Sequence, residues 1–358
     1  MNQSRLSPII LSFSCILIGS CCTRATPDTG KAAPPKAAAS PAPSAVSPAK
    51  PKTALVLKGK NEYELDVFRL GSNSPLGFKV SSTNAGQVQT GDDRPKLSPD
   101  GQWLAYGMSG RLWLAAVDGS QPPIQITKFS KGEVDLLLGG WSPNGQSLLF
   151  HQGLPKAEDA KPMPPGISEG FYQLSLKDKR VTYVPELKGF DVWDSDSLHI
   201  FYVNNRDKKY ELVRASTSGG PEAVLQETDD GYGFGQITRC GSDLAYLLKA
   251  RIERSKPNGS GLVHITPQGG IADFQLPFCS PDALSVMYQH NVKSAPNGDM
   301  TVEVSMGGSV KALHQCKGGC SKTAWESATS ILVLDAGTVH RVSLAGVKET
   351  VATGVVDL

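Results

Sequence analysis

Residues 95–127 have the sequence PKLSPDGQWLAYGMSGRLWLAAVDGSQPPIQIT. Three short apolar runs lie within it, at Trp103–Tyr106, Leu112–Val117 and Ile124–Ile126. The runs are separated by Ser-Pro-Asp-Gly, Ser-Gly and Asp-Gly, so the segment is typical of antiparallel strands joined by tight turns. A set of strands this small cannot bury both of its faces, and we therefore expect further copies of it in the chain.

The Ser-Pro-Asp-Gly turn, here called the anchor turn, recurs along the chain. Clear copies begin at Ser142 and Ser280, and weaker copies begin at Asp194, Gly241 and Glu326. Counted from Ser98, successive anchor positions are 44, 52, 47, 39 and 46 residues apart. A period in the forties with about four strands per unit predicts an all-β fold of the β-propeller type.

The repeat resembles the TolB-type, WD40-like (PD40) repeat of periplasmic β-propellers. The residues that carry the resemblance are Pro95, Ser98-Pro99-Asp100-Gly101, Leu104-Ala105-Tyr106, Leu112-Trp113, Asp118-Gly119 and Ile126-Thr127. The resemblance implies a propeller over residues 54–358 that acts by binding protein partners at the cell envelope. The chain departs from the TolB pattern because it has a lipoprotein signal and no separate N-terminal domain before the repeats. Since many unrelated functions occur on propellers, function has to be argued from sites.

The number of four-stranded blades expected is six or seven. The first unit has strand-like runs at Ala54–Lys58, Tyr63–Leu70 and Phe78–Ser81 but lacks the anchor turn. After the last unit the chain continues as Gly354–Leu358. We infer that this C-terminal strand supplies the missing inner strand of the first unit, which closes a ring of seven blades without a free sheet edge. If the first strands instead join the last unit, there are six blades.

Residues 1–20 have the pattern of a lipoprotein signal peptide, with Arg5 before an apolar stretch at Ile9–Ile18. Ile18-Gly19-Ser20-Cys21 matches the lipobox, which implies cleavage before Cys21 and acylation (for example palmitate) of that cysteine. The residue after it is Cys22 rather than aspartate, which by resemblance implies an outer membrane lipoprotein facing the periplasm of a bacterial cell envelope. An ordinary cleaved signal with an incidental cysteine is the alternative.

Residues 21–53 form the lipidated N-terminus and a Pro/Ala-rich linker, which we expect to be disordered because it lacks apolar periodicity. A spacer is the first interpretation and a Pro-rich recognition site the second. The whole chain has 36 Lys and Arg against 34 Asp and Glu, so its charge gives no reason to expect nucleic acid as a partner. No Gly-rich phosphate loop opens a helix, and we expect no cofactor.

Long connections are expected on one face of the ring, which we call the long-loop face. They are His151–Gly170, Asn204–Lys209, Ala250–Gly261 and His290–Asp299. Long loops on a rigid scaffold are a usual place for binding. The candidate binding residues for an envelope protein or glycan are Arg206, Lys208, Lys209, Arg251, Arg254, His151 and His290. Solvated loops without a partner are the alternative.

Four cysteines in the repeats are disulfide candidates, because the export signal implies an oxidising compartment. Cys316 and Cys320 are separated by a Gly-containing loop, which suits a local disulfide. Cys240 and Cys279 each precede an anchor position in neighbouring units, and they form either a disulfide or a pair of buried thiols. We assign no metal site, because we find no Cys-His arrangement with ligand spacing.

No catalytic residue is assigned from the sequence. Gly166-Ile167-Ser168-Glu169-Gly170 matches the bare GxSxG pattern, but it leads into an apolar strand rather than into a helix as serine hydrolases require. We therefore interpret the chain as a lipid-anchored binding scaffold or adaptor. The alternative is a glycan- or peptide-processing enzyme with its site at the mouth of the central channel.

Replacing Cys21 with serine should leave the chain soluble or uncleaved, because the serine hydroxyl cannot accept the thioether-linked lipid. Incorporation of labelled palmitate and membrane fractionation measure this, with Cys22→Ser as the matched control that stays acylated. A processed and acylated Cys21→Ser chain would contradict the lipoprotein prediction.

Overall fold

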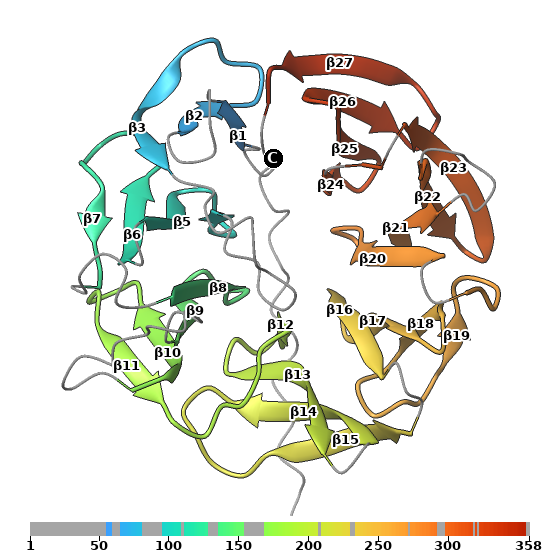
Figure 1. Cartoon of the computed structure of the whole chain (residues 1–358), viewed down its shortest axis with the longest axis horizontal. Coiled ribbons are helices and arrows are strands. Elements are labelled where there is room, and N and C mark those ends of the chain that lie inside the picture. Colours follow the sequence, from blue (N-terminus) through green and yellow to red (C-terminus); the bar gives the residue numbers. More distant parts are fainter. Residues whose placement is uncertain are drawn as a thin grey trace, which may run out of the picture. The chain divides into compact units, whose positions relative to one another are not determined.

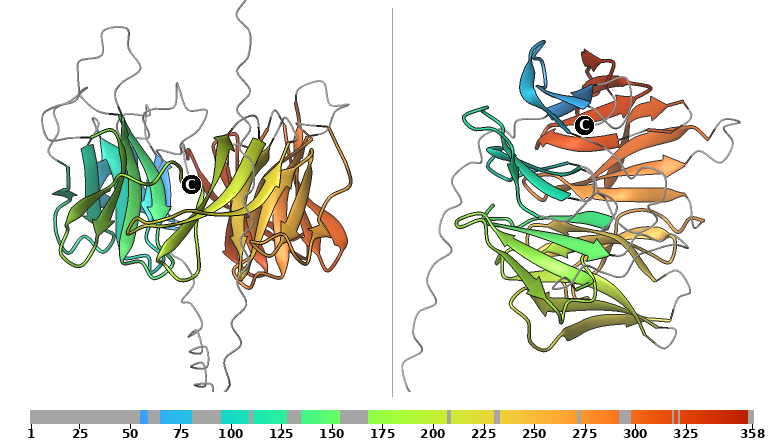
Figure 2. Two further views of the ribbon diagram at one scale, coloured as in Figure 1. Left: turned by 90° about the horizontal axis from the view of Figure 1, so that it is seen from below. Right: turned by 60° about the vertical axis from the view of Figure 1, so that its left-hand side comes forward.

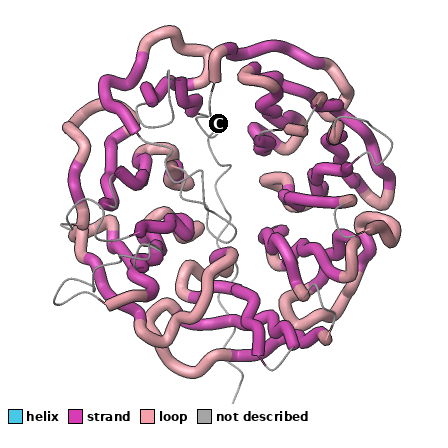
Figure 3. The backbone as a smooth tube through the Cα atoms, viewed as in Figure 1, coloured by secondary structure: helices cyan, strands magenta, loops and turns pink. Residues whose placement is uncertain are grey.

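The computed structural model describes residues 55–58, 65–80, 95–108, 111–127, 135–153, 168–206, 209–229, 233–270, 273–291, 298–317, 319–320 and 322–355. The predicted signal peptide and linker, residues 1–53, lie outside the described residues. Strands joined by turns and loops make up the described part, and it contains no helix (Figure 3). A membrane-spanning helix is accordingly not found among these residues.

The strands form seven antiparallel sheets, six of four strands and one of three. The three-stranded sheet comprises β1 (Leu55–Lys58), β2 (Leu65–Arg69) and β3 (Pro75–Val80). The next three sheets comprise β4 (Lys96–Leu97), β5 (Trp103–Met108), β6 (Arg111–Ala116) and β7 (Ile124–Gln125); β8 (Asp135–Trp141), β9 (Ser147–Gly153), β10 (Gly170–Ser175) and β11 (Val181–Val184); and β12 (Val192–Trp193), β13 (His199–Arg206), β14 (Lys209–Ser216) and β15 (Ala223–Thr228).

The remaining three sheets follow the same order along the chain. They comprise β16 (Phe234–Cys240), β17 (Asp243–Leu248), β18 (Arg251–Ser255) and β19 (Val263–His264); β20 (Phe274–Cys279), β21 (Ser285–Asn291), β22 (Met300–Met306) and β23 (Ser309–Cys316); and β24 (Lys322–Ser327), β25 (Ser330–Asp335), β26 (Thr338–Ser343) and β27 (Lys348–Thr353).

The sheets are the blades of a β-propeller, and all of them belong to the compact unit Pro48–Leu358 (Figure 1). In each four-stranded blade the first strand lies nearest the central channel and the fourth lies at the rim. Viewed from the side, the connections collect at two opposite faces (Figure 2). The predicted all-β propeller with four-stranded blades is confirmed: six blades are complete, and the three-stranded sheet occupies a seventh place in the ring.

The predicted closure by the C-terminal strand is not visible in the described residues. β27 belongs to the last blade, and only Gly354 and Val355 of the terminal stretch are described. The Val355 N–H donates to the Gly337 carbonyl oxygen (3.0 Å). The Val355 side chain is buried in an apolar cluster that also includes Phe68 and Leu70 at the end of β2. The last blade therefore packs against the three-stranded sheet, while strand exchange by Gly354–Leu358 stays a prediction.

The anchor turns show why Ser and Asp or Asn occur together in the repeat. Ser98 Oγ donates to Asp100 Oδ1, and it accepts the backbone N–H of Trp103 (2.9 Å) at the start of β5. The equivalent bonds join Ser142 to Asn144 and Ser147, and Ser280 to Asp282 and Ser285. In each case one hydroxyl fixes both the turn and the first residue of the second strand. The motif is therefore a local folding unit that satisfies backbone groups left free by the turn.

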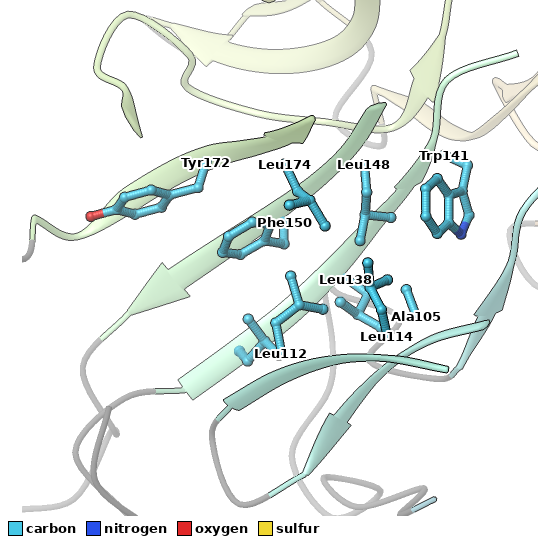
Figure 4. Close-up of a cluster of buried hydrophobic side chains, with 10 residues drawn as sticks. Ala105, Leu112, Leu114, Leu138, Trp141, Leu148, Phe150, Tyr172 and Leu174 are labelled. Atoms are coloured by element: carbon cyan, nitrogen blue, oxygen red, sulfur yellow. The ribbon is translucent and has the colours of Figure 1, made fainter. Parts of the chain in front are cut away.

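The core lies between neighbouring blades. Figure 4 shows one such cluster, in which Leu112 and Leu114 of β6 face Leu138, Leu148 and Phe150 of the next blade. These side chains are at most 2% exposed. Burying one such side chain contributes about 1.5–3 kcal/mol. Repetition of the interface around the ring therefore supplies the apolar burial that one blade cannot provide.

A second contact joins blades at the residue just before an anchor, here called the pre-anchor position, which is tryptophan at three of the six anchors. Trp141 Nε1 donates to the Lys96 carbonyl oxygen (2.8 Å), and Trp193 Nε1 donates to the Gly140 carbonyl oxygen (2.9 Å). Trp325 Nε1 donates in the same way to the carbonyl oxygen of Phe278 (3.0 Å). Each tryptophan thus bonds to the backbone of the preceding inner strand.

Replacing Trp193 with phenylalanine should lower the free energy of unfolding by about 1–3 kcal/mol, because the Gly140 carbonyl oxygen loses its donor. Trp113→Phe is the matched control, since the Trp113 Nε1 atom is buried without a hydrogen-bond partner. The control removes an unsatisfied donor with a similar loss of volume and should be much less destabilising. Urea unfolding measures both, and equal losses would refute a stabilising role for the bond.

Candidate ligand site in the central channel

A pocket of about 340 Å³, here called the channel pocket, is lined by residues on or next to the inner strands of three consecutive blades. Its residues come from β8 and its anchor turn, from β12 and the two residues before it, and from β16. They are Gly139, Gly140, Trp141, Pro143, Phe190, Asp191, Val192, Trp193 and Arg239. The volume lies at the small end of the range for ligand sites, which suits one ring or one short side chain.

Aromatic rings form the apolar part of this channel pocket. Phe190 and Trp193 lie edge to face, with ring centroids 6.4 Å apart. A Cβ atom at Gly139 would lie 3.0 Å from the Phe190 ring, so glycine allows the ring to approach the β8 backbone. The indole N–H groups of Trp141 and Trp193 are already used between blades, and the tryptophans therefore offer the pocket mainly apolar surface.

Arg239 provides the positive charge of the channel pocket. Its Nε donates to the Gly241 carbonyl oxygen (2.9 Å), whereas its Nη1 atom is buried without a hydrogen-bond partner. Burial lowers the pKa of Arg239, and the carboxylates of Asp194 and Asp196 oppose this effect. A guanidinium group remains charged under these conditions, so the free N–H groups are suited to a carboxylate or phosphate.

Asp191 supplies a carboxylate to the same pocket. Its Oδ2 accepts the backbone N–H of Val203 (2.8 Å). Asp191 is exposed as a residue, yet protein encloses most of its carboxyl group, and this desolvation raises the pKa of the carboxyl group. Burial of this kind disfavours the charged form of a carboxyl group.

Arg239 and Asp191 are not among the residues predicted from the sequence. Arg239 lies one residue before the pre-anchor position and Asp191 lies just before β12, so both are tied to the repeat pattern. Their convergence depends on blades that are about 50 residues apart in the sequence. One sequence feature does mark this pocket: Trp141 and Trp193, which precede two successive anchors, both line it.

The predicted basic residues of the long-loop face do not form one cluster. Arg206 Nε lies 3.9 Å from Glu211 Oε2, Lys209 Nζ lies 3.3 Å from Glu227 Oε2, and Arg251 Nε lies 2.7 Å from Glu253 Oε1. These cations are therefore at least partly neutralised within their own blades. Lys208 lies outside the described residues.

The predicted loop over Ala250–Gly261 is wrong. Lys249 and Ala250 form a two-residue turn with positive φ angles of 50° and 59°, and Arg251–Ser255 is strand β18. The turn lacks the Asn or Gly that usually marks such a conformation, which explains the error. Arg254 consequently lies at the opposite face, where its side chain bonds to Asp243 Oδ2 (3.0 Å) and to the Ala283 carbonyl oxygen (2.7 Å).

The two predicted histidines lie in blades that are not neighbours. The His151 ring packs against Phe171, with centroids 5.0 Å apart, and burial lowers its pKa while Glu169 opposes the shift. His290 Nδ1 lies 3.1 Å from Glu303 Oε1. The structure therefore does not bring His151 and His290 together into one site.

The disulfide candidates lie in two pairs. Cys240 is joined to Cys279 and Cys316 to Cys320, each with Cα atoms 5.2 Å apart, within the range for a disulfide. Cys240 and Cys279 occupy pre-anchor positions, so their bond joins β16 and β20 where other blades use tryptophan. The structure also places His314 and Asp335 beside Cys316, a grouping that the sequence analysis did not find.

The described part of the GxSxG segment, Ser168–Gly170, leads into strand β10. Ser168 precedes β10, and its backbone carbonyl oxygen accepts the Tyr172 hydroxyl (2.6 Å). No helix follows it in the described chain, as the sequence analysis expected.

No protein-family model and no curated protein sequence matches the chain. Among solved structures, an oligogalacturonate lyase from Vibrio parahaemolyticus aligns with a TM-score of 0.55 and 12% identity, covering 84% of this chain and 86% of the lyase. Dipeptidyl peptidase 4 from Porphyromonas gingivalis aligns with a TM-score of 0.50 and 13% identity over 83% of this chain. This chain spans about half of that peptidase, 49% of its length.

A protein described as TolB from Agrobacterium tumefaciens is similar at 21% identity, covering 66% of this chain and 84% of that protein, with a TM-score of 0.43. The 12% and 13% identities of the lyase and the peptidase establish a common fold only. The chain therefore shares the β-propeller fold of the lyase and of the peptidase propeller domains.

Replacing Asp191 with asparagine should stabilise the protein at neutral pH. Because the folded-state pKa of Asp191 is raised, the folded protein holds this proton after the unfolded chain has lost it. The free energy of unfolding therefore falls as the pH rises from the ordinary pKa of 3.8 through the raised folded-state pKa. Asparagine does not titrate, so the Asp191→Asn variant does not lose this stability. Urea unfolding between acid and neutral pH measures the effect.

Glu326→Gln is the control of opposite sign, because hydrogen bonds from Arg341 hold the pKa of Glu326 below its ordinary value. The paired glutamate stabilises above its ordinary pKa and loses this contribution as the pH falls, so glutamine should destabilise at neutral pH. A destabilised Asp191→Asn variant at neutral pH would contradict the assigned direction.

Proposed function

We propose that this protein is a lipid-anchored, periplasm-facing β-propeller that acts as a binding scaffold or adaptor for an envelope protein or glycan. The observation that carries the proposal is the channel pocket at Arg239, which combines aromatic walls with a partly unbonded guanidinium group. Such a pocket accepts an acidic group attached to an apolar or ring-shaped body. The ligand therefore presents a carboxylate or another anion to Arg239.

The location in the envelope is supported by the lipobox that ends at Cys21 and by the two disulfides of the propeller. Disulfides persist in oxidising compartments such as the periplasm, whereas cytosolic thiols are kept reduced.

The test is crosslinking in intact envelopes followed by capture of the anchored protein and mass spectrometry. Wild type is compared with Arg239→Gln, which keeps a polar side chain but removes the charge from the channel pocket. We expect one envelope component to be captured by wild type and its yield to fall at least about tenfold with Arg239→Gln, as for loss of a charge-assisted bond of about 1.5–3 kcal/mol.

The matched control is the double variant Arg206→Gln and Lys209→Gln, which removes exposed cations from the long-loop face. Capture that survives the control but not Arg239→Gln supports the pocket. Capture that depends only on Arg206 and Lys209 places binding on the long-loop face, and no specific capture by wild type refutes the adaptor function. Thermal unfolding checks that the variants remain folded, and Arg239→Lys should keep part of the binding.

An enzyme is the second candidate, because Asp191 has a raised pKa in a pocket that also holds a cation. Groups with these properties serve as general acids or bases in many enzymes. The name of the Vibrio parahaemolyticus relative gives oligogalacturonate, an acidic oligosaccharide, as a first substrate to try. Shortening of this oligosaccharide by wild type but not by Asp191→Asn would favour the enzyme over the scaffold.

A further inference from the structure

The interface between the last two blades contains a cluster of three side chains of types that can bind metals, and the cluster lies apart from the channel pocket. His314 and Cys316 belong to β23, and Asp335 ends β25. One ligand atom from each lies within 4.8 Å of the other two. We call these three residues the His-Cys-Asp cluster.

Strand geometry explains how the three residues meet. His314 and Cys316 are two positions apart on β23 and therefore point to the same side of the strand. Cys316 packs in the apolar cluster that also contains Val333 and Val342 of the last blade. Asp335 lies two positions beyond Val333, on the same side of β25, so its carboxylate meets the β23 side chains across the interface.

The cluster is well enclosed. His314 is 7% exposed and Cys316 is fully buried. His314 Nε2 lies 3.1 Å from Asp335 Oδ2, and the ring of His340 on β26 lies 5.3 Å from that of His314. The carboxylate therefore already orients the imidazole, and a second imidazole stands nearby.

The present covalent state excludes strong metal binding by sulfur. Cys316 is joined to Cys320, and a disulfide sulfur lacks the thiolate charge that metals prefer. Cys316 and Cys320 are four positions apart, which matches the C-x₃-C spacing found in zinc sites. Reduction would therefore leave the Cys316 thiolate beside His314 and Asp335, and it would free the nearby Cys320 thiolate to turn toward them.

We propose that reduction of the Cys316–Cys320 disulfide converts this interface into a tetrahedral zinc site formed by Cys316, Cys320, His314 and Asp335. One nitrogen, two sulfurs and one carboxylate oxygen are ligands of the kinds that Zn²⁺ takes. The disulfide and the metal then exclude each other, so the site is occupied only in the reduced protein.

An external dithiol supplies the electrons and protons that reduce the Cys316–Cys320 disulfide. The dithiol is oxidised to its own disulfide and transfers two electrons and two protons to the sulfurs of Cys316 and Cys320. Zinc then displaces the two thiol protons to solvent, and His314 binds as the neutral imidazole. Reoxidation by a disulfide donor reverses these steps and releases the metal.

The experiment measures Co²⁺ binding, because tetrahedral Co²⁺ bound by thiolate has visible ligand-field bands and a near-ultraviolet charge-transfer band. The full chain carries Cys15→Ser, Cys21→Ser and Cys22→Ser so that only the four propeller cysteines remain. A phosphine reductant is used, since it does not bind the metal as a dithiol does. We expect one equivalent of Co²⁺ to give both bands after reduction, no bands before it, and displacement by Zn²⁺.

Variants separate this site from the other thiols. Adding Cys240→Ser and Cys279→Ser should preserve the bands, whereas Cys320→Ser should abolish the two-thiolate spectrum. His314→Gln and Asp335→Asn should each weaken Co²⁺ binding at least about tenfold. Loss of a residue that only hydrogen-bonds to a metal ligand already weakens binding by about this factor, and loss of a ligand should weaken it at least as much. Circular dichroism identifies any variant that fails to fold, and Asp335→Asn at the strand end then serves in place of His314→Gln.

Three outcomes would overturn the proposal. They are a reduced protein that gives no thiolate band, an oxidised protein that binds Co²⁺ equally well, and binding that is unchanged in both His314→Gln and Asp335→Asn. None of these results depends on the function proposed for the channel pocket.

Discussion

The ring depends on contacts between neighbouring inner strands, because the backbone ladders of each blade run only within its own sheet. At the pre-anchor position, Trp141, Trp193 and Trp325 each donate an indole N–H to the inner strand of the preceding blade. At the same position Cys240 and Cys279 join two blades covalently. These links fix the distance between inner strands, and the apolar clusters then fill the space behind them. The pre-anchor position thus sets the spacing of most blades, through an indole hydrogen bond at three junctions and a disulfide at one.

The channel pocket lies beside the junction between β12 and β16, which lacks a link of this kind in the described residues. Of the five junctions between four-stranded blades, the one between β12 and β16 has neither an indole bond nor a disulfide at the pre-anchor position in the described residues. The pocket opens here, and Arg239 enters it from β16. Cys240 forms its disulfide with Cys279 of the next blade. Arg239, the residue before it, is the only residue of β16 that lines this pocket. The sequence Arg239-Cys240 therefore accounts for both features: Cys240 bonds to the next blade and not across the β12–β16 junction, and Arg239 enters the pocket at that junction.

The sequence predicted the features that depend on local chemistry. The Ser-Pro-Asp-Gly turns, the strands after them and the four-stranded repeat follow from side chains that bond within a few residues, as Ser98 and Asp100 do. The turn at Lys249 and Ala250 escaped prediction because neither residue type favours its positive φ. The channel pocket and the His-Cys-Asp cluster could not be derived, because Arg239 meets Phe190 and His314 meets Asp335 only after separate blades have packed. Convergence of this kind depends on the curvature of the ring, which the periodicity does not specify.

The bond between Cys240 and Cys279 encloses almost one complete blade, because the two residues are 39 positions apart and β17–β19 lie between them. A protease that cuts anywhere between Gly241 and Phe278 would leave both fragments covalently attached, and the inner strands on either side would keep their spacing. The same loop cannot be drawn out when the chain is pulled from its ends, so this part of the propeller is shielded from extension. When the chain is pulled from its two ends, the 39-residue segment between the two cysteines therefore adds almost nothing to the length of the extended chain.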